Sequence, residues 1–182
     1  MKKFFATIAV ALILLQFVGC GAEKKPEPKQ EAAVLRSNVK ITADAANEKL
    51  ILGALWILQE RTPDFFRLVD ENVLEIRKSD GSFTTGPVKT IEGTGRIEFK
   101  NFAGVHSEYN IADFLVHEAT HIVDQKKGLR LSKAAEIRAR EAEIEFFKQL
   151  ETAEKRSFAS MIKFIENEIG QIRAGKLYAD LD

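Results

Sequence analysis

Residues 114–123 of this chain read FLVHEATHIV, and the prediction of the rest of the fold begins from this stretch. His117 and His121 stand four residues apart in it, and Glu118 directly follows the first histidine. On an α-helix, residues four apart are separated by about 6 Å along the axis and by about 40° around it, so the two imidazoles face the same way. The flanking residues are uncharged, as a helix buried in a protein requires. The stretch therefore predicts a buried helix with two histidines on one side.

This helix is predicted to span about residues 111–127. Asn110 is the expected N-cap, Asp113 suits the positive end of the helix dipole, and Gly128 marks the end of the helix. Helical spacing of apolar residues predicts further helices, and period-two alternation with turn signals predicts short strands. The expected helices are 44–61, closed by Pro63, then 132–150 and 154–173, and the expected strands are 73–78, 88–92 and 96–102.

The order of these elements predicts an α+β fold: a small, mainly antiparallel sheet packed on the motif helix, followed by a helical C-terminal half. The length of 182 residues suits one domain with a modest core. Lys plus Arg and Asp plus Glu both number 27, so no overall positive charge recruits nucleic acid. A single cysteine excludes an internal disulfide and any site built from several thiolates.

Two histidines at this spacing suit a zinc ion, which binds imidazole nitrogens at about 2.0–2.1 Å. Glu118 lies beside the pair, where it can accept a proton from a metal-bound water molecule. A catalytic zinc also needs a third protein ligand and one open position. The candidate metal ligands on this helix are therefore His117 and His121, with Glu118 as the candidate catalytic residue.

The H-E-x-x-H motif of residues 117–121 resembles that of the zincin superfamily of metallopeptidases, and the resemblance covers about residues 95–150. It implies Zn²⁺ as the cofactor and hydrolysis of peptide bonds by metal-activated water. The metzincin continuation H-x-x-G-x-x-H is excluded, because Asp124 and Lys127 stand at its glycine and second histidine positions. The gluzincin pattern, in which a glutamate of the following helix binds the metal, remains.

Helical phase separates the glutamates of that following helix. At 100° per residue, Glu136 and Glu143 fall within its apolar arc, whereas Glu141 falls on the opposite, polar arc. Residues 136–139 (EIRA) also resemble the E-x-x-A pattern of several small bacterial gluzincin-like proteins. We therefore expect Glu136 to be the third ligand, with Glu143 as the alternative. Pairing of both glutamates with basic side chains such as Arg140 is the competing structural interpretation.

Several further residues are candidates for supporting roles. Asp124 falls on the same side of its helix as the histidines, where it can orient an imidazole or an arginine, or lie on the surface as a helix-terminal residue. His106, Tyr109 and Tyr178 are each able to stabilise an oxyanion, and the sequence selects none of them. In zincins the strand before the motif helix forms the sheet edge along which a peptide substrate lies, and the resemblance assigns residues 96–102 to that strand.

The N-terminus has the features of an export signal. After two lysines, an apolar run covers residues 4–18, shorter than the roughly 20 residues that a membrane-spanning helix needs. Residues 17–20 (FVGC) resemble the bacterial lipobox, which implies a signal peptide at 1–19 and a lipid on Cys20. The polar stretch that follows predicts a tether over residues 20–38, before a single domain at 39–182.

The lipobox resemblance implies a protein anchored to the bacterial cell envelope, outside the cytoplasm. Gly21 in place of aspartate after the cysteine is similar to the sorting signal for the outer membrane of Gram-negative bacteria. The leading hypothesis is a membrane-tethered zinc metallopeptidase acting on a peptide or protein substrate, with no nucleic-acid partner. The alternative hypothesis is a non-catalytic envelope lipoprotein that serves as a binding scaffold, with structural zinc or none, and a weaker one is an inhibitor or chaperone of a partner protease.

Overall fold

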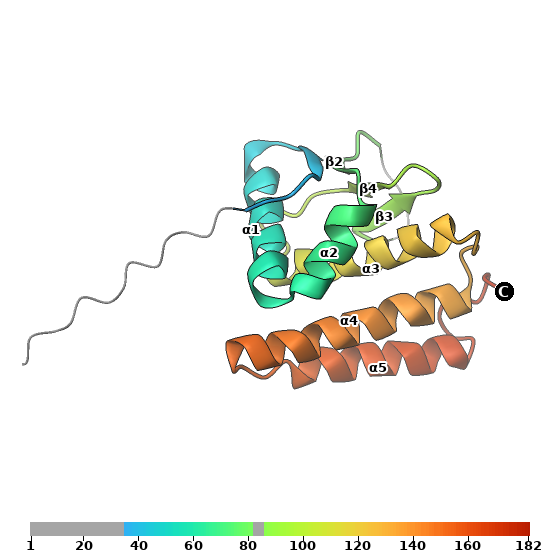
Figure 1. Ribbon diagram of the computed structural model, residues 1–182. Helices are drawn as coiled ribbons and strands as arrows, with labels where there is room; N and C mark the ends of the chain where they lie inside the picture. Colours follow the sequence, from blue (N-terminus) through green and yellow to red (C-terminus); the bar gives the residue numbers. More distant parts are fainter. Residues whose placement is uncertain (1–34, 82–85) are drawn as a thin grey trace, which may run out of the picture. The chain divides into compact units, whose positions relative to one another are not determined.

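The computed structural model describes residues 35–81 and 86–182, and these residues form an α+β fold, as predicted (Figure 1). The predicted signal peptide at 1–19, the lipidation site Cys20 and most of the tether lie outside the described residues. In the part of the chain that is described, no helix combines the length and the apolar character needed to cross a membrane. The elements, in chain order, are β1 (Lys40–Thr42), α1 (Ala45–Arg61), α2 (Pro63–Asn72), β2 (Glu75–Lys78), β3 (Val88–Ile91), β4 (Arg96–Phe99), α3 (Glu108–Lys126), α4 (Lys133–Glu154) and α5 (Ala159–Arg173).

The sheet of the described residues has the strand order β1-β2-β4-β3, and the prediction of a mainly antiparallel sheet is wrong. The β1–β2 and β2–β4 pairs are parallel, and the β3–β4 pair is antiparallel. Helices α1 and α2 form a long crossover between β1 and β2, which lets β2 run in the same direction as β1. The short turn between β3 and β4 joins these two strands as a hairpin, in which Thr94 N donates to Ile91 O at 3.2 Å.

This order corrects the expectation for the strand at residues 96–102. Strand β4 lies inside the sheet, between β2 and β3, so it is not an edge strand. The edge nearest to the motif helix is β3, which contacts α3. Strand β4, which precedes the motif helix in sequence, is therefore hydrogen-bonded to a strand on each side, and its hairpin partner β3 forms the edge.

Helix α1 closely matches the prediction, whereas α2 was not predicted and α3 begins earlier than predicted. Helix α1 begins after Asp44, whose side chain accepts a hydrogen bond from Asn47 N at 3.1 Å, and it ends near Pro63 as expected. Pro63 then starts α2, a helix that was not predicted, because proline is well suited to the first turn, where no backbone N–H donor is needed. Helix α3 begins after Ser107 and not after Asn110, since the two side chains form a reciprocal capping box.

The next two helices are also displaced from their predicted ends. Helix α4 follows Ser132, whose hydroxyl accepts from Ala135 N at 3.2 Å. It continues to Glu154, four residues beyond the predicted end, and stops where Lys155 adopts a left-handed conformation with φ 52°. Helix α5 consequently begins at Ala159 and not at residue 154.

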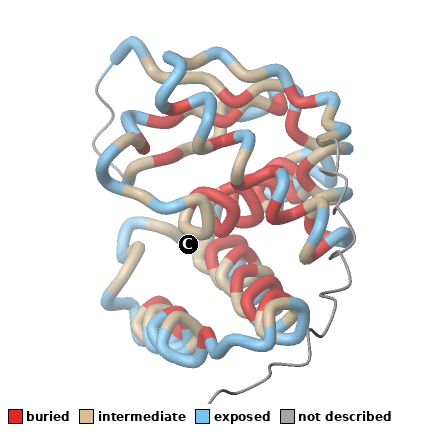
Figure 2. Tube along the Cα trace, turned by 90° about the vertical axis from the view of Figure 1, so that its left-hand side faces the viewer, coloured by how far each residue is buried: buried red, intermediate tan, exposed pale blue. Residues whose placement is uncertain are grey.

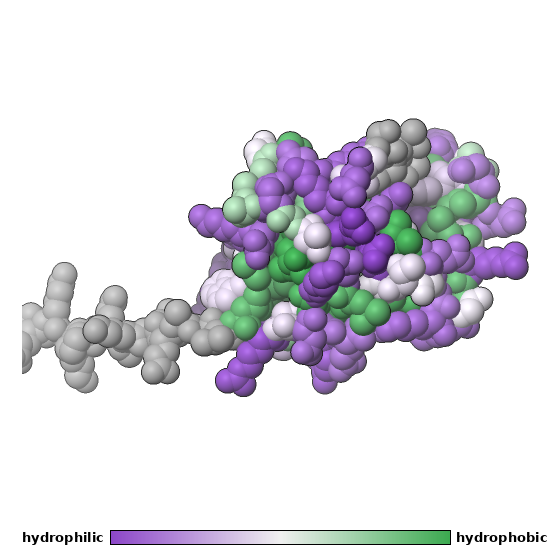
Figure 3. All heavy atoms as spheres, turned by 90° about the horizontal axis from the view of Figure 1, so that it is seen from above, coloured by the Kyte–Doolittle hydropathy of each residue, from purple (hydrophilic) through white to green (hydrophobic). Residues whose placement is uncertain are grey.

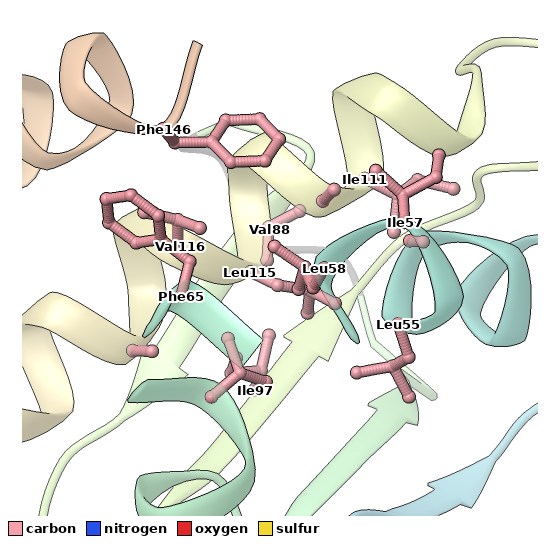
Figure 4. Close-up of a cluster of buried hydrophobic side chains, with 14 of the residues drawn as sticks. Leu55, Ile57, Leu58, Phe65, Val88, Ile97, Ile111, Leu115, Val116 and Phe146 are labelled. Carbon is pink, nitrogen blue, oxygen red and sulfur yellow. The ribbon is translucent and has the colours of Figure 1, made fainter. Parts of the chain in front are cut away.

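Helix α3 is the centre of the packing. It contacts α1, α2, α4 and β3, while α5 packs on α4 (Figure 1). Buried residues gather where the helices face one another and the sheet (Figure 2). Side chains from the helices and from the sheet meet in one cluster, in which Leu115 of α3, Leu58 of α1 and Ile97 of β4 are fully buried (Figure 4). Each such side chain stabilises the fold by about 1.5–3 kcal/mol, so α3 is a well-anchored scaffold for its histidines.

The folded domain reaches further toward the N-terminus than predicted. Residues 35–38 were assigned to the tether, but Arg36 N donates to Gln59 Oε1 at 2.8 Å and Asn38 N donates to Asp70 Oδ1 at 2.7 Å. Ser37 also donates to Asp70, through its hydroxyl at 2.9 Å. These bonds fix the segment to α1 and α2.

On the surface, polar and charged residues dominate the face in Figure 3, with hydrophobic residues in several areas between them.

Candidate metal centre

Three potential ligand atoms from α3 and α4 converge at one point. His117 Nε2 and His121 Nε2 are 3.0 Å apart. The Glu136 carboxylate lies beside both, with its Oε2 3.6 Å from His117 Nε2 and its Oε1 3.5 Å from His121 Nε2. In a tetrahedral zinc site with bonds of about 2.0–2.1 Å, neighbouring ligand atoms are separated by about 3.3–3.4 Å. Among the described residues, His117, His121 and Glu136 form a group of metal-binding side chains whose ligand atoms all lie within 4.8 Å of one another. The donor types and their spacing both fit zinc.

Glu136 reaches this point because small residues let α4 approach α3 closely. Ala135 and Ala139 are 1% and 0% exposed, and they lie beside Glu136 on the face of α4 that packs on α3. Glu136 is itself buried, and its Oε2 has no hydrogen-bond partner among the described residues. A buried carboxylate oxygen that accepts no hydrogen bond is costly, and a cation bound at this position would compensate for it. Glu141 instead points outward and pairs with Arg173 at 3.4 Å, as its helical phase predicts.

Glu143, the alternative third ligand, lies at a different position. Its Oε1 is 2.8 Å from His117 Nδ1, the ring nitrogen that does not face Glu136 and His121. Both of its oxygens accept from Arg140 Nη1, at 2.9 and 3.0 Å. A carboxylate that accepts from Nδ1–H fixes the tautomer of the ring and leaves Nε2 free to bind a metal. The ion pair with Arg140 matches the competing interpretation for Glu143, whereas Glu136 lies next to the histidines.

Behind Glu143, a buried polar cluster extends between α3, α4 and α5. Arg140 Nη2 lies 3.3 Å from Glu168 Oε2 on α5, so this arginine joins two carboxylates. Asp113, one helical turn before His117, is buried as well, and its Oδ1 has no hydrogen-bond partner among the described residues. Burial and the nearby charge of Glu143 raise the pKa of Asp113 well above its usual range. Sequence reasoning gave Asp113 a role at the helix end and missed this cluster, although its i, i+4 spacing from His117 was a usable signal.

The two histidines have opposite proton affinities when no metal is bound. Burial alone would lower the pKa of His117, but the carboxylates of Glu136 and Glu143 outweigh that effect and raise it to about 10. Burial, followed by the positive charge of His117, lowers the pKa of His121 to about 4. The pair therefore carries one positive charge at neutral pH, on His117. Burial would raise the pKa of Glu136, but the adjacent His117 lowers it overall, so this carboxylate stays ionised.

Glu118 lies on the side of α3 that faces the sheet edge. The hydroxyl of Thr90, in the edge strand β3, donates a hydrogen bond to Glu118 Oε2 and lies 3.3 Å from the Glu118 backbone oxygen. Glu118 is 9% exposed. Burial raises the pKa of its carboxyl, although the charge of His117 and the bond from Thr90 oppose the increase. Sequence reasoning did not find Thr90, because its contact depends on the pairing order of the sheet.

Asp124, predicted to orient an imidazole or an arginine, is hydrogen-bonded to an arginine. Its Oδ2 accepts two hydrogen bonds from Arg138 on α4, at 3.0 Å from Nε and 2.7 Å from Nη2. Asp124 is buried and not a surface residue. It also lines, with His121 and Ala135, a cavity of about 10 Å³, which is close to the space that one water molecule needs.

Of the three candidates for oxyanion stabilisation, the structure brings Tyr178 next to a predicted ligand. His106 packs between the rings of Phe102 and Phe114, with ring centroids 5.9 and 5.1 Å away. Tyr109 donates through its hydroxyl to Glu154 Oε1 at 2.8 Å, remote from the histidine pair along α4.

The hydroxyl of Tyr178 interacts with Glu136 and Arg140. Burial and the charge of Glu136 raise the pKa of Tyr178, so the phenol keeps its proton. The segment that carries it turns back to the start of α4, where Lys133 N donates to Asp182 O at 3.1 Å. Tyr178 adopts a left-handed backbone conformation, with φ 51°, which is strained for a non-glycine residue and typical of constrained sites.

Searches of protein-family models, of curated proteins and of solved structures find no match for this chain.

Proposed function

We propose that the protein is a zinc-dependent peptidase, held at the bacterial cell envelope by a lipid on Cys20. The observation that carries the proposal is the convergence of His117, His121 and the buried carboxylate of Glu136, whose Oε2 accepts no hydrogen bond from the described residues, with Glu118 on the neighbouring position of α3. Bound by these three residues, zinc would supply Lewis acidity toward a water molecule and a peptide carbonyl.

Glu118 would act as the general base and acid of the reaction. Its carboxylate accepts the proton of the attacking water and then delivers it to the leaving amine. Burial raises its pKa, which brings it closer to the neutral range in which one group can both accept and donate a proton. The hydroxyl of Tyr178 would donate a hydrogen bond to the carbonyl oxygen of the substrate as negative charge develops on that oxygen.

The edge strand β3 is the proposed docking site for the substrate. Its outer side has no strand partner among the described residues, so an extended peptide could add to the sheet along this edge. Because β3 is also the strand whose Thr90 contacts Glu118, a peptide added along it would lie beside the catalytic glutamate. This supports a peptide or protein substrate.

The proposed localisation rests on the resemblance of residues 17–20 to the lipobox alone. Cleavage before Cys20 and lipidation of its sulfur would place the domain outside the cytoplasm, at the outer membrane in a Gram-negative host. The folded domain extends to residue 35, so the tether would span residues 20–34. Because acidic and basic residues are equal in number, the chain has no overall positive charge to attract nucleic acid, which supports the proposal of a peptide or protein substrate.

One observation favours the alternative, a non-catalytic envelope lipoprotein with structural zinc. The cavity that His121 lines is about 10 Å³, and the Tyr178 hydroxyl interacts with Glu136, so a protein side chain already lies beside the candidate third ligand. A structural site is closed by a fourth protein ligand, whereas a catalytic site keeps an exchangeable position. Binding of a hydroxamate, which needs that position, would separate the two functions.

The experiment measures metal content and peptide hydrolysis in the purified protein and three variants. We expect about one zinc per chain in the wild type, and its loss in His117→Ala. Glu118→Gln should keep zinc but lose hydrolysis of fluorescein-labelled casein. His106→Gln, which changes the histidine away from the site, should keep both. Equal zinc in the wild type and His117→Ala, or full activity of zinc-loaded Glu118→Gln, would refute the proposal.

A further inference from the structure

The contact between Thr90 and Glu118 joins the sheet edge to the motif helix. Thr90 lies in the middle of β3, where it pairs with Ile97 of β4. Its hydroxyl donates to the Glu118 carboxylate from a residue 28 positions away in the sequence. Among the described residues, the hydroxyl of Thr90 is the group that donates a hydrogen bond to the Glu118 carboxylate.

The position of Thr90 in its strand makes the hydroxyl notable. Residues two apart in a strand point to the same face, and Val88 on that face is 8% exposed and belongs to the hydrophobic core. A valine at position 90 would fill nearly the same volume as threonine. The hydroxyl therefore adds one property to this site, the ability to donate to Glu118.

The Glu118 carboxylate has more than one rotamer available unless a bond or a contact selects one. A donor on a paired backbone strand is a fixed reference point, because β3 is hydrogen-bonded to β4 along its length. Such a donor holds the carboxylate in one orientation relative to the strand.

We propose that Thr90 is a positioning residue, which holds Glu118 in register with a peptide docked along the outer side of β3. This inference rests on the proposed peptidase function. One strand would then align both reaction partners: its backbone orients the peptide, and its threonine hydroxyl orients the general base. Orientation of this kind affects the rate of the chemical step more than the binding of the substrate.

The test compares Thr90→Val, which removes the hydroxyl, with Thr90→Ser, which keeps it. Thr42→Val is the matched control, because Thr42 is also a strand threonine whose hydroxyl donates to a glutamate, Glu75, at 2.9 Å, but on β1 at the opposite edge. Activity is measured on a quenched fluorescent peptide selected from a random library as one that the wild type cleaves. Zinc content and melting temperature are measured for every protein.

We expect Thr90→Val to lower kcat by roughly 10- to 100-fold, the range for a catalytic group that loses its alignment, while KM changes less than about twofold. Zinc content should stay at the wild-type level. Thr90→Ser should recover most of kcat, and Thr42→Val should match the wild type. If Thr90→Val does not fold, Thr90→Ala is compared with Thr90→Ser in the same way.

The contrary results fall into separate groups. Wild-type kcat in Thr90→Val, a change confined to KM, or loss of zinc together with activity would overturn the positioning role and leave the peptidase proposal intact. Failure of the wild type to cleave casein or any peptide of the library would overturn both proposals.

Discussion

Replacing Glu143 by glutamine should destabilise the metal-free protein and weaken zinc binding at the same time. The side chain is 1% exposed, and it connects His117 Nδ1 to Arg140 through bonds of 2.8–3.0 Å. Glutamine keeps the size but removes the charge. Its amide also presents a donor to one of two groups that donate already, because only one of its two terminal atoms can accept a hydrogen bond.

Removal of one partner of a buried ion pair costs about 3–5 kcal/mol. Two features place this variant at the lower end of that range. Arg140 keeps Glu168 at 3.3 Å, and buried Asp113 loses the nearby charge of Glu143 that helps to raise its pKa. We therefore expect a decrease of about 3 kcal/mol in the free energy of unfolding, or roughly 6–12 °C in melting temperature for a chain of this size. Zinc affinity should fall by about 10- to 100-fold, as it does when the group that orients a histidine ligand is lost.

Urea denaturation of EDTA-treated protein measures the first quantity, and competition with a chromophoric zinc chelator measures the second. Glu141→Gln is the control, since Glu141 lies on the same helix but is exposed and pairs with exposed Arg173. Its effect on stability should be below about 1 kcal/mol, with no change in zinc affinity. A Glu143→Gln variant that is indistinguishable from Glu141→Gln in both assays would show that Glu143 neither pairs in the core nor orients His117.

Three further predictions concern the same centre. In metal-free protein, the stability that protonated His117 contributes should be complete below about pH 6.5 and be lost as pH rises toward 10, because the carboxylates of Glu136 and Glu143 outweigh burial and raise its pKa to about 10. Denaturation of EDTA-treated protein across that range should show the loss, and zinc-loaded protein should not, because the metal replaces the proton. Ala139→Leu should separate α4 from α3 and cost about 1–3 kcal/mol, since Ala139 is fully buried between them; a leucine variant with wild-type melting temperature and zinc content would contradict the close packing. Tyr178→Phe should keep zinc but lower kcat by about 10²- to 10³-fold if its phenol stabilises the oxyanion, and unchanged kcat in a steady-state assay would rule that role out.

The helices that carry the candidate ligands were predictable from local patterns. The spacing of His117 and His121 fixed their common face, and helical phase separated Glu136 from outward-facing Glu141. Both inferences need only a regular helix, since residues on one helix have fixed relative positions. The same argument placed Glu143 on the buried side but did not distinguish a metal ligand from a partner of the imidazole, because that choice depends on how far along α4 the two helices cross.

Features set by pairing between distant segments were not predictable. The strand order puts β3 at the edge, and with it Thr90 beside Glu118, but no local pattern encodes which strand takes the inner position. Helix α2 was missed because Pro63 was interpreted as an end signal, although proline also suits a helix start. Tyr178 reaches Glu136 through a turn of the segment after α5, and its positive φ is not a property that the residue type suggests.

The candidate ligands come from two parts of the domain that meet at a single seam. His117 and His121 belong to the helix that packs on the sheet, whereas Glu136 belongs to the hairpin of α4 and α5, which is joined to that helix by the short segment 127–132. An ion bound by these residues would link α3 to the α4–α5 hairpin. Because the connecting segment is short, little chain entropy is lost when the ion holds its two ends together. The hairpin already packs on α3 through the common core without an ion. Bound zinc would add its binding free energy to that packing, so metal-free protein should open locally at the hairpin, and be cleaved there by proteases, more often than zinc-loaded protein.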